Sequence, residues 1–205
     1  IAYNLNLLGG KPGPMATVGQ DFRSYREQFE HCGIPPSQIK VMPDLYTAQA
    51  FITADLDDNQ ITAFHPGAMM RSYENHVRDV QDVAFGIVGP DSYEAMLQNC
   101  REFSEAGIPF IFDPGQAMPL FNGEELKQMI ESATYVTVND YESLLMSDKT
   151  GLSVTEIRDQ VQAYIITRGD KGSEIHTPQG VISIPAAAPI RVVDPTGCGD
   201  AYRAG

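Results

Sequence analysis

The sequence predicts an α/β fold, a three-layer α/β/α sandwich with a mostly parallel central sheet and a small β flap. Short, fully apolar segments alternate along the chain with longer amphipathic segments, which is typical of strands buried between helices on both faces of a parallel sheet. The 205 residues are 42% hydrophobic and 20% charged, so the chain can build a proper core. We therefore predict a single globular domain over residues 1–205.

The first half of the chain interrupts this alternation with a hairpin. A helix ends near residue 8, where two glycines follow, because glycine is common just past a helix end. Residues 46–55 and 60–64 flank the turn sequence Asp57-Asp58-Asn59 and are rich in Thr, Ala, Ile and Phe, which predicts a β-hairpin. We interpret residues 45–66 as a flap, or lid. The other predicted elements here are a strand, a helix and a strand: 14–19, 21–32 and 38–42.

In the second half, strands and helices alternate regularly. The predicted strands are 83–88, 109–112, 135–138, 164–167, 174–176, 181–184 and 190–193. The predicted helices are 92–106, 123–133, one through Glu142, 154–161 and one that begins near Asp200. Ligands bind such a sheet at the carboxyl ends of its strands, so polar residues that follow apolar strands are the candidate site residues.

Composition argues against several classes of function. The formal net charge is −13 and Lys and Arg form no cluster, so we expect no nucleic-acid partner. The three cysteines are scattered without metal-ligand spacing, which indicates a reducing compartment. The sequence has no long apolar run and no signal peptide, so we expect a soluble, cytoplasmic protein without a membrane partner. Both ends of the chain fall within predicted helices, so we expect it to be the middle of a longer protein.

The segment Asp194-Pro-Thr-Gly-Cys-Gly-Asp200 joins the last predicted strand to the last predicted helix. Glycines let the backbone approach a ligand, and a helix start presents unpaired N–H groups with partial positive charge. Gly197, Cys198 and Gly199 therefore form a cradle suited to phosphate. A carboxylate beside phosphate is unfavourable, but Asp200 is explained if it takes a proton from an attacking hydroxyl. The alternative is an ordinary strand–loop–helix corner, and the turn alone leaves both explanations open.

Three further apolar strands end in polar residues. The sequences after them are Asp113-Pro-Gly-Gln116, Asn139-Asp-Tyr-Glu142 and Thr167-Arg-Gly169. Each has a structural alternative: a turn, a helix cap and a hairpin turn, respectively. Taken together with the glycine–aspartate turn, they favour a functional edge of the sheet.

These motifs resemble those of the ribokinase-like kinases, also called the phosphofructokinase-B or pfkB family. Asp194–Asp200 resembles the second signature of the family, which implies that Asp200 is the catalytic base and that Gly197, Cys198 and Gly199 form the anion hole. Asn139–Glu142 matches the Asn-x-x-Glu motif, which implies that Glu142 organises Mg²⁺ through water. The nucleotide-binding residues that the resemblance implies are Asn139, Glu142, Thr167, Gly169, Asp194 and Thr196.

The flap gives the clearest indication of the acceptor. Phe51, Phe64 and Met69 lie on or beside it, and aromatic rings with a methionine suit a flat purine. Plain packing of the flap on the core is the commoner explanation of such residues. The motifs nevertheless look most like those of bacterial adenosine kinases, which implies that Phe51, Phe64 and Met69 sandwich adenine and that Gln116 binds substrate.

The sequence thus predicts an ATP-dependent small-molecule kinase that transfers the γ-phosphate to a primary hydroxyl. Our first choice is the 5′-hydroxyl of adenosine, with Asp200 as general base, Mg²⁺ as cofactor and K⁺ as a further candidate that the resemblance suggests. The alternatives are a ribose- or fructose-type sugar kinase and a non-catalytic nucleoside or nucleotide sensor. A Rossmann dehydrogenase is disfavoured because no Gly-x-Gly-x-x-Gly follows an early strand. A homodimer through the lid is left open.

Overall fold

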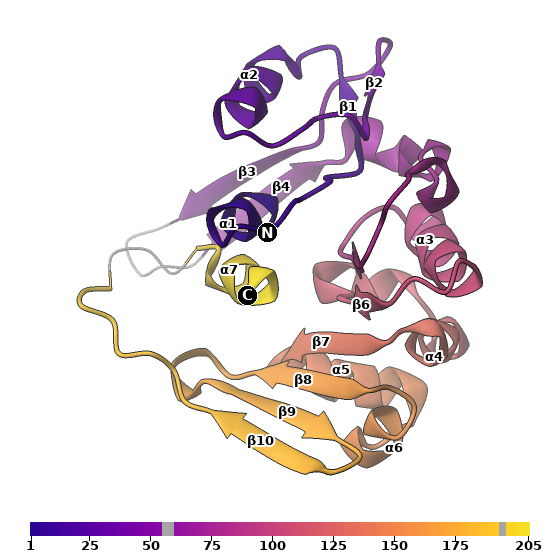
Figure 1. The fold of residues 1–205 in the computed structure, drawn as a ribbon, viewed down its shortest axis with the longest axis vertical. Helices are drawn as coiled ribbons and strands as arrows, with labels where there is room; N and C mark the ends of the chain where they lie inside the picture. Colours follow the sequence, from indigo (N-terminus) through magenta and orange to yellow (C-terminus); the bar gives the residue numbers. More distant parts are fainter. Residues whose placement is uncertain (55–59, 193–195) are drawn as a thin grey trace. The chain divides into compact units, whose positions relative to one another are not determined.

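The computed structural model describes residues 1–54, 60–192 and 196–205 (Figure 1). These residues form two compact units: residues 1–75 together with 196–205, and residues 76–195. We refer to them as the first and the second unit. The turn predicted at residues 57–59 and the nucleotide-binding role predicted for Asp194 lie outside the described residues.

The second unit is built on a six-stranded mixed sheet with the order β10-β9-β8-β7-β6-β5. Strands β5 to β8 run parallel, and β9 and β10 continue the sheet in antiparallel fashion. Parallel neighbours need crossover connections, which α3 to α6 supply. The strands are β5 (Gly86–Val88), β6 (Phe110–Phe112), β7 (Tyr135–Asn139), β8 (Ala163–Thr167), β9 (Ser173–Thr177) and β10 (Gly180–Ile184). The helices are α3 (Tyr93–Glu105), α4 (Gly123–Ser132), α5 (Asp140–Thr150), α6 (Val154–Arg158) and the 3-10 helices η2 (Val77–Asp79), η3 (Gly115–Leu120) and η4 (Gly169–Lys171).

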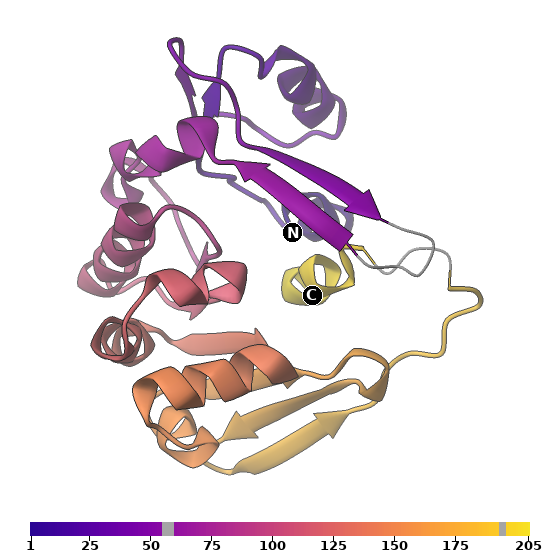
Figure 2. The same ribbon diagram turned by 180° about the vertical axis from the view of Figure 1, so that it is seen from behind.

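One face of this sheet carries the core of the unit. Helices α3, α4 and α5 pack side by side (Figures 1 and 2). The Tyr164 hydroxyl of β8 donates a hydrogen bond to Ser143 Oγ of α5 at 2.9 Å. Its register neighbours, Val136 of β7 and Phe112 of β6, lie on the same face. All three strand side chains have 0% exposure, so the sheet is a rigid support for the loops at its edge.

Three successive helices of this unit begin with the same motif, a capping box. In each, a side chain at the N-cap accepts from the backbone N–H three residues later, and the glutamate there accepts from the N-cap backbone. This reciprocal pairing satisfies two donors at the helix start. The pairs are Asn122–Glu125 in α4, Asn139–Glu142 in α5 and Ser153–Glu156 in α6.

The first unit contains a two-stranded parallel sheet and the predicted hairpin. Strands β1 (Ala16–Gly19) and β2 (Ile39–Met42) are joined by α2 (Arg23–His31) and enclose a small core of Val18, Phe22 and Ile39. The hairpin consists of β3 (Gln49–Ala54) and β4 (Gln60–His65), and the 3-10 helix η1 (Gly67–Glu74) follows it. Helix α1 (Ala2–Leu7) packs against α7 (Cys198–Ala204) although the two lie far apart in sequence (Figure 1).

Some sequence predictions were wrong in detail. Residues 190–192 of the predicted strand 190–193 are in no strand, and the Ile190 and Val192 side chains are exposed. An apolar run becomes a strand only where another strand supplies backbone partners, and no described strand does so here. The strand predicted to start at residue 83 starts at Gly86, and the 3-10 helices were not predicted. Among the described residues, no helix is long and apolar enough to cross a bilayer.

Candidate functional site

The glycine–aspartate turn forms the start of α7 in the first unit. Gly197 is the N-cap with φ +81°, in the left-handed region that favours glycine. Cys198, Gly199 and Asp200 make up the first turn and are exposed, and Thr196 precedes the cap. Amides in the first turn of a helix have no acceptor within the helix. Within the described residues, the turn therefore places backbone donors that lack a helical acceptor next to an exposed carboxylate, the combination predicted from the sequence.

The hairpin register separates the two aromatic residues of the predicted adenine clamp. Phe51 is paired with Ala63, and Phe64 with Ala50. Directly paired residues of antiparallel strands point to the same face, and the next pair points to the other. Phe51 and Phe64 therefore lie on opposite faces of the hairpin, with 60% and 54% exposure. The two rings are therefore not presented together on one face of the hairpin, and the adenine-binding role of Phe51, Phe64 and Met69 stays a prediction. Met69 lies in η1 and is half-buried.

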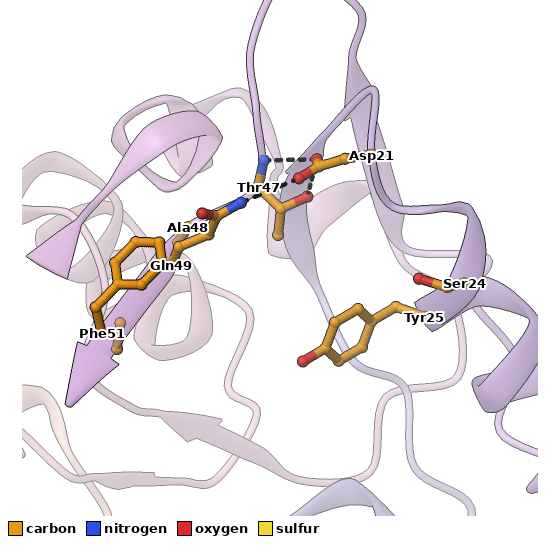
Figure 3. A pocket seen from close by; sticks show the side chains of 8 residues that line it. Asp21, Ser24, Tyr25, Thr47, Ala48, Gln49 and Phe51 are labelled. Carbon is orange, nitrogen blue, oxygen red and sulfur yellow. Dashed lines mark hydrogen bonds between the residues drawn. The ribbon is translucent and has the colours of Figure 1, made fainter. Parts of the chain in front are cut away.

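The face of Phe51 looks onto a pocket of about 380 Å³ at the base of the hairpin (Figure 3). Asp21, which follows β1, is central to it. Its carboxylate accepts hydrogen bonds from the Thr47 backbone N–H at 2.8 Å and the Thr47 hydroxyl at 2.7 Å. These donors, the backbone N–H first, hold the pKa of Asp21 below its usual value. Asp21 was not predicted from the sequence, although a carboxylate two residues after an apolar strand fits the rule that identified the other candidates. The pocket is lined by Asp21, Ser24, Tyr25, Thr47, Ala48, Gln49, Ala50 and Phe51.

In the second unit, the carboxyl ends of neighbouring strands bring several predicted residues together. Asn139, the last residue of β7, is paired in register with Thr167, the last residue of β8. Gly169 follows directly in η4 with φ +56°. Gln116 lies in η3, which follows β6. These residues therefore follow the neighbouring strands β6, β7 and β8, and their binding roles stay predictions.

Glu142 is the residue of this edge best suited to a metal. Its Oε2 accepts from the Asn139 backbone N–H at 2.8 Å, while Asn139 Oδ1 accepts from the Glu142 N–H at 2.7 Å. The structural alternative, a helix cap, is therefore present. In the part of the chain that the structure describes, the other oxygen, Oε1, has no hydrogen-bond partner, and no three His, Cys, Asp or Glu residues gather into a metal cage. One available carboxylate oxygen without a cage fits Mg²⁺, which keeps several waters and binds substrate phosphates.

Comparison with known proteins identifies the class. The pfkB family of carbohydrate kinases matches residues 1–205. A nucleoside kinase of Methanocaldococcus jannaschii is 32% identical over 206 residues, which cover 100% of this chain and 68% of that protein. The chain therefore belongs to the pfkB carbohydrate kinase family, whose members phosphorylate hydroxyl groups, and it is a small-molecule kinase.

Solved structures of two nucleoside kinases are similar to this chain in fold and sequence. The nucleoside kinase of Burkholderia thailandensis in complex with inosine has a TM-score of 0.95 and 53% sequence identity, over 99% of this chain and 67% of that one. The M. jannaschii nucleoside kinase, an archaeal member of the ribokinase family, has a TM-score of 0.94 with 30% identity, over 100% of this chain and 68% of that one. The ribokinase-like α/β sandwich predicted from the sequence is thus confirmed. The chain spans about two thirds of the length of these relatives.

Proposed function

We propose that this chain belongs to an ATP-dependent nucleoside kinase that phosphorylates the 5′-hydroxyl of a purine nucleoside. The observation that carries the proposal is the 53% identity with the B. thailandensis nucleoside kinase, whose structures contain inosine and ADP-inosine. Adenosine, predicted from the sequence, and inosine share the ribose and differ at position 6 of the purine. Identity at this level supports the purine nucleoside class, and adenosine remains our prediction within it.

Asp200 is the proposed general base. It takes the proton of the 5′-hydroxyl as the oxygen attacks the γ-phosphorus of ATP, and ADP leaves. The amides of Gly197, Cys198 and Gly199 stabilise the charge on the transferred phosphoryl group. The exposure of Asp200 and its position in the first turn of α7 support these roles. Thr196 and Asp194 remain predicted nucleotide contacts.

Glu142 is the proposed organiser of Mg²⁺, through water on Oε1. When bound there, Mg²⁺ would supply positive charge next to the phosphate oxygens of ATP. The capping box fixes the carboxylate, because Oε2 is held by the Asn139 backbone. Asn139, Thr167 and Gly169 are proposed to contact the nucleotide and Gln116 the acceptor, and K⁺ remains a predicted further ion.

The flap is proposed to cover the acceptor and exclude water, so that ATP is not simply hydrolysed. We propose that the acceptor binds on the face of the hairpin that carries Phe64. Phe51 shares its face with Gln49, which reaches Asp21 beside α2. The hairpin face that carries Phe64 is therefore the one opposite to Gln49 and Asp21.

The test is a phosphorylation assay with the full-length protein, ATP and Mg²⁺, and adenosine, inosine, ribose or fructose as acceptor. We expect a nucleoside 5′-monophosphate and ADP in equal amounts. Transfer to ribose or fructose alone would show a sugar kinase. Tight nucleoside binding without any product would show a sensor, and either result overturns the proposal.

A further inference from the structure

We infer that Asp21 is a positioning residue that fixes the direction of the flap by holding Thr47 at its root. We call this pair the flap latch. The inference rests on the proposed function, because the direction of the flap matters for activity only if the flap covers the acceptor. Asp21 itself lies outside the proposed base, anion hole and metal site.

The latch joins the end of β1 to the start of β3. Asp21 Oδ1 accepts from both the backbone N–H and the hydroxyl of Thr47, and Oδ2 accepts from Gln49 Nε2 at 3.4 Å. The Thr47 hydroxyl in turn accepts from the Gly19 backbone N–H at 3.0 Å. Thr47 is therefore held by hydrogen bonds from two directions, and Figure 3 shows the bonds from Thr47 and Gln49 to the Asp21 carboxylate.

The returning strand is fixed at the same point. The Ala68 N–H donates to the Tyr46 carbonyl at 2.8 Å, and the Thr17 hydroxyl of β1 donates to the Ala68 carbonyl at 2.7 Å. Gly19 and Gly67 both pack so closely on Tyr46 that a Cβ at either position would collide with its backbone. Both ends of the hairpin thus meet at residues 46–47, next to Asp21.

Beyond this root, little else determines where the hairpin points. Among the described elements, β3 and β4 pack chiefly on each other. Their apolar side chains are exposed on both faces: Phe51, Ile52, Ile61 and Phe64 are 54% to 78% exposed. The pocket on the face of Phe51 leaves space between β3 and α2 (Figure 3). A small change of angle at the root therefore displaces the last residues of β3 and the first residues of β4 by a much larger distance.

Asp21 itself is exposed, so its hydrogen bonds add little to global stability. Their effect is geometric, because a carboxylate that accepts from an N–H and a hydroxyl on the same residue fixes the orientation of that residue. Without the latch, the flap samples a wider range of directions. It then covers the acceptor less often, and water reaches the bound ATP more often.

The test compares full-length wild type with Asp21→Ala, Thr47→Val and Thr47→Ser. Asp21→Ala removes the oxygen that accepts both bonds from Thr47, and Thr47→Ser keeps the hydroxyl. Glu27→Ala is the matched control, because Glu27 is an exposed carboxylate on the adjoining helix α2. The measurements are the nucleoside KM, the fraction of ATP hydrolysed without transfer, the melting temperature and amide hydrogen exchange over residues 46–52.

For Asp21→Ala we expect the nucleoside KM to rise about tenfold, as when a group that orients a binding site is lost. We also expect more uncoupled hydrolysis, faster exchange over residues 46–52 and an unchanged melting temperature. Thr47→Val should change these quantities in the same direction, and the double variant should be no worse than Asp21→Ala. Thr47→Ser and Glu27→Ala should behave as wild type.

Two failures are distinguishable. If wild type transfers phosphate to no nucleoside, the proposed function fails, and the exchange measurement alone decides whether the latch exists. If wild type is active but Asp21→Ala keeps its KM, coupling and exchange, the latch is wrong. An activity loss that only follows a lowered melting temperature would also overturn it.

Discussion

The hairpin of the first unit and the sheet of the second are held in place by different means. Phe112, Val136 and Tyr164 of the sheet have no exposed surface, whereas Phe51 and Ile61 of the hairpin are 60% and 78% exposed. Packing fixes the strands of the sheet and thus the positions of the residues that follow them. The hairpin depends on hydrogen bonds and close backbone contacts at one end. The first arrangement suits groups that must stay in place, and the second suits a cover that must open.

The largest effect should come from the proposed base. We expect Asp200→Asn to lower kcat by about 10²- to 10⁴-fold, the usual contribution of a general base, with no change in the melting temperature because the side chain is exposed. Product formation in the nucleoside assay measures it. Asp148→Asn on α5 removes a carboxylate from the second unit and serves as control. Wild-type turnover in Asp200→Asn would remove the base assignment.

The metal proposal predicts a difference between two capping boxes. Glutamine can replace glutamate in this motif, so Glu142→Gln and Glu156→Gln should both melt as wild type does. Only Glu142→Gln should require more Mg²⁺, about 10- to 100-fold, as when a residue that orients a metal shell is lost. Titration of activity with Mg²⁺ distinguishes the two variants. If Glu142→Gln and Glu156→Gln require equal concentrations of Mg²⁺, Glu142 caps the helix and does not organise the metal.

The hairpin register predicts unequal roles for its two phenylalanines. Phe64→Ala should raise the nucleoside KM about tenfold, because it removes one aromatic contact with a base. Phe51→Ala should leave that KM nearly unchanged, since its side chain is on the other face. Steady-state kinetics with adenosine and inosine measure both. The reverse result would assign the acceptor to the face of Phe51.

The smallest effect concerns the buried Tyr164 hydroxyl. Tyr164→Phe should lower the free energy of unfolding by about 1 kcal/mol at pH 7, because the hydrogen bond to Ser143 is lost. Burial raises the pKa of Tyr164 to about 12 from 10.0. Between pH 10 and 12, the unfolded chain therefore ionises while the folded chain keeps the proton, so wild type loses stability as pH rises. The free energy of unfolding of Tyr164→Phe should fall less over this pH range. The curves of unfolding free energy against pH for wild type and variant should therefore converge. Denaturant unfolding against pH measures this, and parallel curves would contradict it.

The sequence was sufficient to predict those elements whose structure depends on residues close together in the chain. Asn-x-x-Glu at residues 139–142 specifies a helix start from four neighbouring residues, and the structure forms it. The alternation of apolar strands and helices predicted the parallel sheet for the same reason. Asp21 was missed because its partner, Thr47, is far away in sequence and only the fold brings the two together.

The sequence was insufficient where pairing decides the structure. Phe51 and Ile52 are adjacent apolar residues, so the hairpin lacks the alternation that would assign one face to the core. A shift of one residue in register moves every side chain to the other face, and the register could not be inferred from composition. The apolar run at residues 190–192 likewise depends on a pairing partner, which no described strand supplies.

The first unit is assembled from two stretches of chain, residues 1–75 and 196–205, and the whole second unit is synthesised between them. Strands β5 to β10 lie in the sheet in the same order as in the chain. Each strand can therefore pair with the preceding one soon after it is synthesised. Helix α7, with the proposed base, arrives after all of them. A nascent chain can therefore pair strands β5 to β10 before it carries Asp200, the proposed base.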